Sequence, residues 1–193
     1  MQAVKLKEFL RIVSSRFAAI LLLAACMNAS ANNKESDVYR PLPFPTGLER
    51  YKTQIFNLFD KSSVDNRTRE PHYDAEFVKQ FKAALKPYLK LDPKLERKLF
   101  SGPGPDGTYI EIDGTRYLFY TICQAHACNT TSLAVLYQPD ARRLTGRLQY
   151  KCERHPLNNP RPEEASAIEA LSPINTKDAF YQESCMYEKQ GTK

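Results

Sequence analysis

The stretch RYLFYTICQAHACNTTSLAVLY, residues 116–137, decides the fold of this chain. Two runs rich in β-branched and aromatic residues, 116–122 and 133–137, flank the short segment from Cys123 to Cys128. Such runs are typical of β-strands, and the short connection between them predicts an antiparallel hairpin. We therefore expect residues 123–128 to form the tip of that hairpin.

The flanking sequence extends this hairpin into a larger sheet. The run Tyr109–Ile112 comes directly before Asp113-Gly114, a dipeptide typical of two-residue hairpin turns. Beyond a turn near Pro139-Asp140, apolar and polar residues alternate over 144–150, which predicts a strand with one side exposed to water. Four sequential strands with short links predict an antiparallel meander.

Apolar residues at helical spacing predict helices on both sides of this meander. A third, short helix is expected between Asp92 and Phe100, after which residues 101–107 (SGPGPDG) break regular structure. Helices flanking an antiparallel sheet make an α+β domain, and 193 residues suit one domain, which we place at 48–193. The other expected helices are a stripe through Leu48, Tyr51, Ile55, Leu58 and Phe59, a stripe over 77–88 with Tyr73-Asp74 at its start, and a helix over Glu163 to Leu171.

Residues 1–25 have the composition of a secretory signal peptide. Four bases and one acid precede an apolar run over 17–25, which is too short to span a bilayer as a helix. Two ends stay open, since the sequence before Cys26 resembles a lipobox, whose cysteine is lipidated, and Ala29-Ser-Ala31 resembles an ordinary cleavage site. The polar, proline-rich residues 26–47 predict a tether.

Both alternatives leave four other cysteines, Cys123, Cys128, Cys152 and Cys185. An even number in an exported domain predicts two disulfides. A Cys123–Cys128 bond is local and fits the hairpin tip, which leaves Cys152–Cys185. A ring this small stabilises the fold by only about 2 kcal/mol, so holding the loop in its binding conformation is the better reason for it.

Inside the ring, His126 is the side chain that can donate and accept hydrogen bonds and titrate near neutral pH. Its neighbours Ala125 and Ala127 are small. Redox enzymes favour Cys-x-x-Cys, with two residues between the cysteines, at the start of a helix. Here four residues separate the two cysteines at a hairpin tip, so a redox enzyme is disfavoured. A Cys/His hydrolase is disfavoured because Cys123 and His126 lie too close in one loop. Export to an oxidising compartment argues against a metal site here, so we expect no enzyme, no metal and no cofactor.

The charge of the chain points to no nucleic-acid partner. The formal net charge of +6 includes the leader, and removing residues 1–25 leaves 24 bases against 21 acids, or +3. No run or motif concentrates this small excess, so a nucleic-acid surface is not indicated.

Residues 117–148 resemble the inhibitor of vertebrate lysozyme (Ivy) family. The resemblance rests on the Cys-x-x-His-x-Cys loop between two apolar strands, on Leu133–Tyr137, and on Leu144-Thr-Gly146 after the next turn. It implies a periplasmic protein of Gram-negative bacteria, with a central sheet flanked by helices, that pushes this loop into the active-site cleft of c-type lysozyme. It also implies that His126 hydrogen-bonds the catalytic carboxylates, while Gln124, Ala125 and Ala127 offer contact surface.

The loop departs from the family pattern, which reads close to Cys-Lys-Pro-His-Asp-Cys. Here Gln124, Ala125 and Ala127 replace the lysine, the proline and the aspartate. Lysozymes are usually basic and this chain is slightly basic, so electrostatic steering between them is poor. The alternative is a non-inhibitory envelope binding protein, or a paralogue that uses the same loop for another partner. A homodimer and a membrane tether through lipidated Cys26 also stay open.

Overall fold

The computed structural model describes residues 38–190, without the side chains of 188–190. The chain divides into Met1–Asp37 and Val38–Lys193, and only the second unit is described below. The expectations for the signal peptide, Cys26 and Ala31 therefore lie outside the described residues. The strands are β1 (Arg40–Leu42), β2 (Thr108–Ile112), β3 (Thr115–Cys123), β4 (Ser132–Gln138), β5 (Arg143–Tyr150) and β6 (Glu153–Leu157), and the helices are α2 (Ala75–Leu91), α3 (Leu95–Leu99), α4 (Pro162–Leu171) and α5 (Ala179–Gln190).

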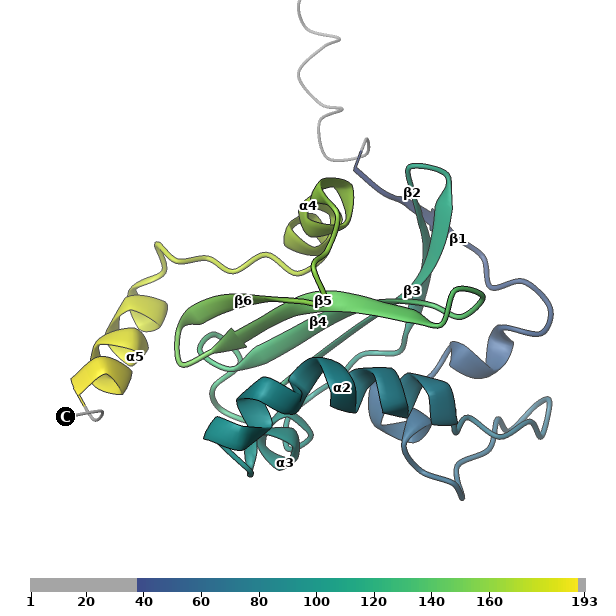
Figure 1. The fold of residues 1–193 in the computed structure, drawn as a ribbon, viewed down its shortest axis with the longest axis horizontal. Coiled ribbons are helices and arrows are strands. Elements are labelled where there is room, and N and C mark those ends of the chain that lie inside the picture. Colours follow the sequence, from purple (N-terminus) through teal and green to yellow (C-terminus); the bar gives the residue numbers. More distant parts are fainter. Residues whose placement is uncertain (1–37, 191–193) are drawn as a thin grey trace, which may run out of the picture. The chain divides into compact units, whose positions relative to one another are not determined.

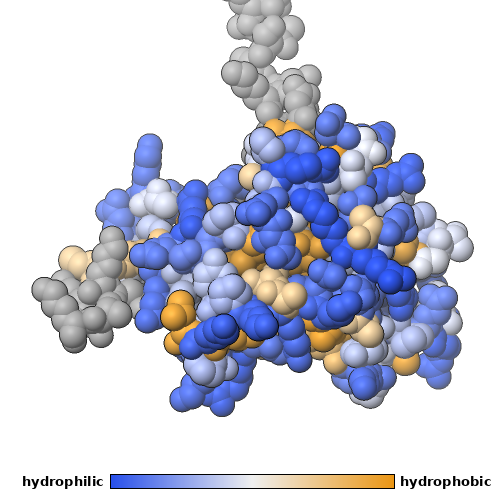
Figure 2. Space-filling view, in the orientation of Figure 1, coloured by the Kyte–Doolittle hydropathy of each residue, from blue (hydrophilic) through white to orange (hydrophobic). Residues whose placement is uncertain are grey.

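The strands form one six-stranded antiparallel sheet in chain order, β1 to β6. Helices α2 and α3 cover one face of the sheet and α4 covers the other (Figure 1). In β3, Leu118, Tyr120 and Ile122 belong to the core under α2. Tyr117 and Phe119 point to the opposite face and pack with α4. With these apolar residues buried, the surface seen in Figure 2 is mostly hydrophilic, with apolar residues in scattered patches. The α+β fold predicted from the sequence is confirmed.

Helix α2 begins as the sequence predicts. The Asp74 side chain accepts a hydrogen bond from the Phe77 backbone N–H at 2.9 Å and caps the helix. The apolar stripe that includes Phe77, Phe81 and Leu85 is buried. The Asp113-Gly114 hairpin is also confirmed, with both residues at positive φ as a type I′ turn requires.

The helix predicted from the stripe that begins at Leu48 is wrong. The structure has two short 3-10 helices instead, η1 (Glu49–Tyr51) and η2 (Ile55–Leu58). Gln54, which lies between them, is extended and forms an isolated antiparallel bridge with Asp106. Tyr51, Ile55 and Leu58 are nevertheless buried. The spacing thus identified the core positions, but pairing with a distant segment determined the backbone.

The expectation of a water-exposed side on the strand over 144–150 is also wrong. Thr145, Arg147 and Gln149 are all buried in β5, because α4 and the segment after it cover that face. Arg147 donates to the Ser172 carbonyl at 2.5 Å and pairs with Glu169 at 2.8 Å. Polar residues on a strand therefore mark a polar packed layer here and not a surface.

Three elements had no clear signal in the sequence. Strand β1 falls within the segment assigned to the tether, and it pairs with β2 as an edge strand of the sheet. Strand β6 follows a turn through Lys151 and Cys152, both at positive φ, where glycine or asparagine is usual. Helix α5 follows an irregular segment after α4. Because neither turn residue of the β5–β6 hairpin is a typical turn former, the sequence did not indicate that hairpin.

Both expected disulfides are present. Cys123 bonds Cys128, and Cys152 bonds Cys185 across 33 residues of sequence. The second bond ties α5 to the β5–β6 turn. The Tyr181 hydroxyl adds a second tie, because it donates to the Cys152 carbonyl at 3.2 Å.

A buried carboxylate, Glu164, holds α4 to the sheet. Its side chain is fully buried, and it accepts hydrogen bonds from Arg143 and, at 2.8 Å, from the Tyr117 hydroxyl. The Arg161 backbone N–H also donates to it at 2.8 Å and completes the cap of α4. Burial alone would raise the pKa of Glu164, but these hydrogen bonds outweigh it and hold the pKa at about 2.

We predict that Glu164 makes stability depend on pH in the acid range. The pKa of Glu164 is about 2 in the folded protein and about 4.5 in the unfolded chain. The charged carboxylate therefore stabilises the folded state above about pH 4.5. That stabilisation, about 3 kcal/mol in order of magnitude, is lost as the pH falls from about 4.5 to 2. In urea unfolding at a series of pH values, Glu164→Gln should have a lower free energy of unfolding at pH 7 than wild type. It should also lose less of that free energy between pH 4.5 and pH 2. Glu163 is the neighbouring acid on α4, and Glu163→Gln should lose as much free energy of unfolding over this pH range as wild type does. An equal loss in wild type and Glu164→Gln would contradict this assignment.

Candidate functional site

The loop closed by the Cys123–Cys128 bond, called here the stapled loop (residues 123–128), lies at the end of the β3–β4 hairpin. Cys123 is the last paired residue of β3 and faces Ser132, the first of β4. The hairpin-tip position expected from the sequence is thus the observed one. All six predicted loop residues come together because they are contiguous between two paired strands.

His126 lies in a tight turn on this loop. The Ala127 backbone N–H donates to the Gln124 carbonyl at 3.0 Å, which closes a four-residue turn with His126 at its third position. His126 has φ of +62°, as type II turns require at that position, where glycine is usual. Its side chain is exposed, so the imidazole is available to a partner.

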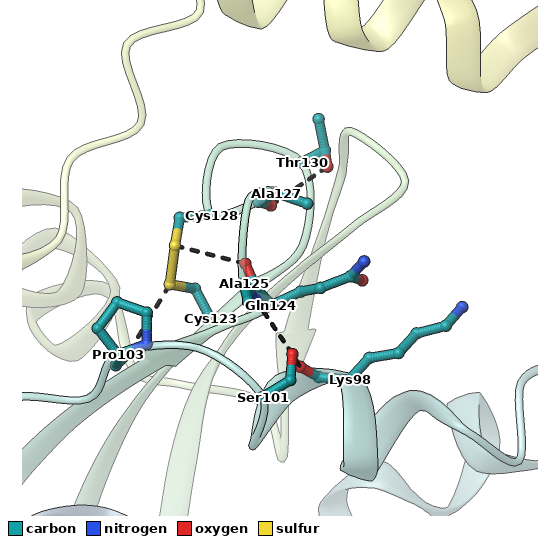
Figure 3. The surroundings of a disulfide bond; sticks show 9 residues. All are labelled: Lys98, Ser101, Pro103, Cys123, Gln124, Ala125, Ala127, Cys128 and Thr130. Carbon is teal, nitrogen blue, oxygen red and sulfur yellow. Dashed lines mark hydrogen bonds between the residues drawn. A yellow bond between two sulfur atoms is a disulfide. The ribbon is translucent and has the colours of Figure 1, made fainter.

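One side of the stapled loop is held by the segment that follows α3 (Figure 3). The Ala125 backbone N–H donates to Ser101 Oγ at 3.1 Å, and that hydroxyl donates to the Lys98 carbonyl at 2.6 Å. Cys123 Sγ lies 3.8 Å from the Pro103 carbonyl oxygen. The loop backbone therefore rests on a segment about 20 residues earlier in the chain.

Gly102 makes this close approach sterically feasible. A Cβ atom at residue 102 would lie 2.2 Å from the Cys123 carbonyl oxygen and 2.7 Å from the Ala125 nitrogen. No other residue fits without moving one of the two backbones. The sequence over 101–107 predicts only a break in regular structure, and nothing in one sequence indicates that Gly102 faces this loop.

The other side of the stapled loop is fixed by residues 129–131. The Thr131 backbone N–H donates to the Ala127 carbonyl at 2.8 Å, and the Gln124 N–H donates to the Thr131 carbonyl at 3.0 Å. The Cys152 N–H donates to the Thr130 carbonyl at 3.2 Å, which joins this loop to the β5–β6 turn. The stapled loop and the second disulfide are thus parts of one connected structure.

Two hollows adjoin the stapled loop. One is bordered by His126 and by residues at the start of α5. The other has a volume of about 390 Å³ and is bordered by both cysteines of the Cys123–Cys128 bond. Both share Cys128, Asn129 and Asp178. Sequence reasoning missed the residues of α5, because its segment had no recognisable pattern and its position depends on the Cys152–Cys185 bond.

The remaining histidines do not join this site. His72 is buried, with Nδ1 2.5 Å from the Arg50 carbonyl, and the His155 ring packs on Tyr88. Across residues 38–190 no group of three or more His, Cys, Asp or Glu side chains is arranged to hold a metal ion. None of the helices in that part of the chain has the length and apolar character needed to cross a bilayer. The site therefore offers a fixed surface loop and one imidazole.

We predict that Gly102→Ala loosens the stapled loop. The added methyl group must displace the Cys123 or Ala125 backbone, which should lower the free energy of unfolding by about 1–3 kcal/mol. Amide hydrogen exchange should be faster at Ala125 and Ala127. Gly104→Ala is the graded comparison, because its Cβ would come no closer than 3.2 Å to the Thr121 carbonyl oxygen. Unchanged exchange in Gly102→Ala would show that the approach is not tight in solution.

The comparisons with known proteins agree with this geometry. The model of one protein family, described as Inhibitor of vertebrate lysozyme (Ivy), matches residues 76–182, which is more than half of the chain. The match spans α2 to the first turn of α5 and contains the whole stapled loop. No curated protein and no solved structure gives a significant match. The fold, the loop and the extent of this match together show that the chain belongs to the Ivy family of lysozyme inhibitors.

Proposed function

We propose that this protein is an exported inhibitor of c-type lysozyme that inserts the stapled loop into the active-site cleft with His126 foremost. The observation that carries the proposal is an exposed imidazole on a turn whose backbone is fixed on both sides. Membership of a family of lysozyme inhibitors supplies the partner. The family is one of inhibitors, and the role assigned to this chain is likewise non-enzymatic.

Preorganisation is the physical advantage of such a loop. A flexible loop loses conformational entropy when it docks, and that loss subtracts from the binding free energy. Here a disulfide, a turn hydrogen bond and the bond from Ala125 to Ser101 restrain the backbone before any partner arrives. The restraint supports tight binding by a contact surface only a few residues wide.

The chemistry of the target suits an imidazole. Glycosidases of this type work with two carboxyl groups, one acting as an acid and one ionised. A histidine ring can donate a hydrogen bond to one group and accept one from the other, according to the protonation of each. We propose that His126 lies between these groups, where it would displace the sugar and change how both carboxyl groups ionise.

The unusual loop sequence is compatible with this role. The family's usual proline would lie at Ala125, and proline has no backbone N–H. In this chain the Ala125 N–H bonds Ser101 Oγ at 3.1 Å, a bond that proline could not make. We propose that this bond replaces the stiffness that a proline ring would give. Gln124 and Ala127 carry no charge, where the family pattern has a lysine and an aspartate.

We also propose that the chain acts in the periplasm of a Gram-negative cell. The signal-like residues 1–25, the two disulfides and the periplasmic setting of the family support export. A lipid on Cys26 would leave the residues between Cys26 and β1 as the tether that holds the domain off a membrane. The mature protein purified from a Gram-negative host should have lost residues 1–25, and its intact mass should show either lipidated Cys26 or a chain that begins at Asn32. A mature protein that retains residues 1–25 would contradict export by this route.

We predict that wild-type protein inhibits c-type lysozyme on cell walls and that His126→Ala weakens inhibition by at least about 30-fold. The few residues that dominate an interface lie near its centre and each cost about 2 kcal/mol or more when truncated to alanine, which corresponds to that ratio. The measurement is the inhibition constant in a cell-wall lysis assay. His155→Ala, which removes a histidine packed on Tyr88, is the matched control and should inhibit like wild type.

Two outcomes would count against the proposal in different ways. If wild-type protein with intact disulfides leaves the lysozyme rate unchanged, inhibition itself is wrong, and a non-inhibitory envelope binding protein or paralogue becomes the better reading. If His126→Ala inhibits as well as wild type, the function stands but the loop mechanism does not. Sedimentation of the free protein would show separately whether it forms a homodimer.

A further inference from the structure

The start of α5 lies beside the stapled loop and shares a hollow with it. The hollow is bordered by His126, Cys128, Asn129, Asp178 and Phe180. Residues 126–129 come from the β3–β4 connection, whereas Asp178 and Phe180 come from about 50 residues later in the chain. Any partner that covers His126 therefore also approaches these two side chains of the C-terminal segment.

Asp178 brings an uncompensated negative charge to this place. One carboxylate oxygen, Oδ1, accepts a hydrogen bond from the Tyr181 backbone N–H at 3.0 Å. In the part of the chain that the structure describes, no lysine or arginine forms an ion pair with Asp178. Among the described residues, and apart from the imidazole of His126, Asp178 is also the only acidic or basic side chain that borders either hollow. The hollow therefore favours a positively charged group.

Phe180 adds an aromatic ring next to this carboxylate. Its exposed fraction is 62%, in contrast to the buried aromatic residues of the core such as Phe77 and Tyr120. A ring face beside a carboxylate is a favourable setting for a guanidinium or ammonium group, through cation–π attraction and ion pairing. The aliphatic part of an arginine or lysine side chain would pack on the same ring.

The position of this pair relative to the loop is fixed by covalent and hydrogen bonds. Cys185 on α5 is bonded to Cys152, and the Tyr181 hydroxyl donates to the Cys152 carbonyl while accepting from Gln149 at 3.2 Å. Cys152 in turn donates its N–H to Thr130 of the β3–β4 connection. The second disulfide thus holds the start of α5 at a constant place beside the stapled loop.

We infer that this hollow receives a basic side chain, arginine or lysine, from the rim of the lysozyme cleft that the stapled loop enters. The inference rests on the proposed function and gives it a second contact point. Lysozymes are usually basic, and the stapled loop lacks the acidic residue that the family has at the position of Ala127. Asp178 supplies a negative charge from a different element, next to His126, where it would meet that basic surface.

Asp178 is the N-cap of α5, because its side chain accepts the hydrogen bond from the Tyr181 backbone N–H. Asp178→Asn tests the charge without removing this cap. Asparagine accepts the same backbone hydrogen bond as well as aspartate does, so the helix should keep its start. Binding of a purified c-type lysozyme, followed by surface plasmon resonance, should weaken by about 5–10-fold, mostly through slower association, and should depend less on salt. Glu183→Gln removes the same charge from an exposed position on α5 outside the hollow and should bind within about twofold of wild type.

Phe180 is tested by two substitutions of different kind. Phe180→Ala should speed dissociation of lysozyme by several-fold, since it removes both the ring and its apolar surface. Phe180→Leu keeps apolar surface but has no π system, and it should fall between Phe180→Ala and wild type. Met186→Ala removes another exposed apolar side chain of α5 and should leave dissociation unchanged.

The outcomes separate this inference from the proposed function. If wild-type protein binds and inhibits lysozyme while Asp178→Asn and Phe180→Ala behave like wild type, the contact at α5 is wrong and the loop mechanism is unaffected. If Asp178→Asn and Glu183→Gln weaken binding equally, only net charge matters and the specific site is wrong. If wild-type protein does not bind lysozyme at all, both the inference and the proposed function fail.

Discussion

The pairing of β3 with β4 is the interaction on which the rest of the structure depends. It runs without interruption from Leu118 opposite Tyr137 to Cys123 opposite Ser132. Every residue between the ends of β4 is buried, so both faces of this pair need cover, and α2 and α4 provide it from opposite sides. A shift of one residue in this register would exchange the two faces of the strand.

The same register fixes where the loop can be held. Because β3 ends at Cys123, the backbone of 123–125 comes within reach of the segment after α3, and Gly102 lets the two chains approach. Ser101 bridges the loop to the end of that helix. Rigidity of the loop thus comes from contacts with a distant segment as much as from its own disulfide. A short ring by itself contributes little to stability, but its fixed surroundings limit the conformations that His126 can adopt.

The two disulfides have different roles in this arrangement. Cys123–Cys128 closes a turn within one hairpin, whereas Cys152–Cys185 joins the β5–β6 turn to α5. Thr130 and Cys152 connect the two regions through a backbone hydrogen bond. The acidic side chain beside His126 also comes from the second region. The stapled loop has no acidic residue, whereas Asp178, directly before α5, borders the hollow that His126 borders. The resemblance that the sequence shows covers residues 117–148, in the first region, whereas the match to the family model also reaches Cys152 and the first turn of α5.

The sequence by itself determined the parts that depend on neighbours along the chain. Strand periodicity, the Asp113-Gly114 turn, the Asp74 cap and the even set of cysteines predicted the meander, helix α2 and both disulfides, and the Cys-x-x-His-x-Cys motif identified the loop. Only the tertiary structure decided that Gln54 is extended, that Arg147 is buried, that Gly102 lies against the loop and that Asp178 lies beside His126. Each of these depends on a contact between residues far apart in sequence, and no local spacing or propensity encodes such a contact.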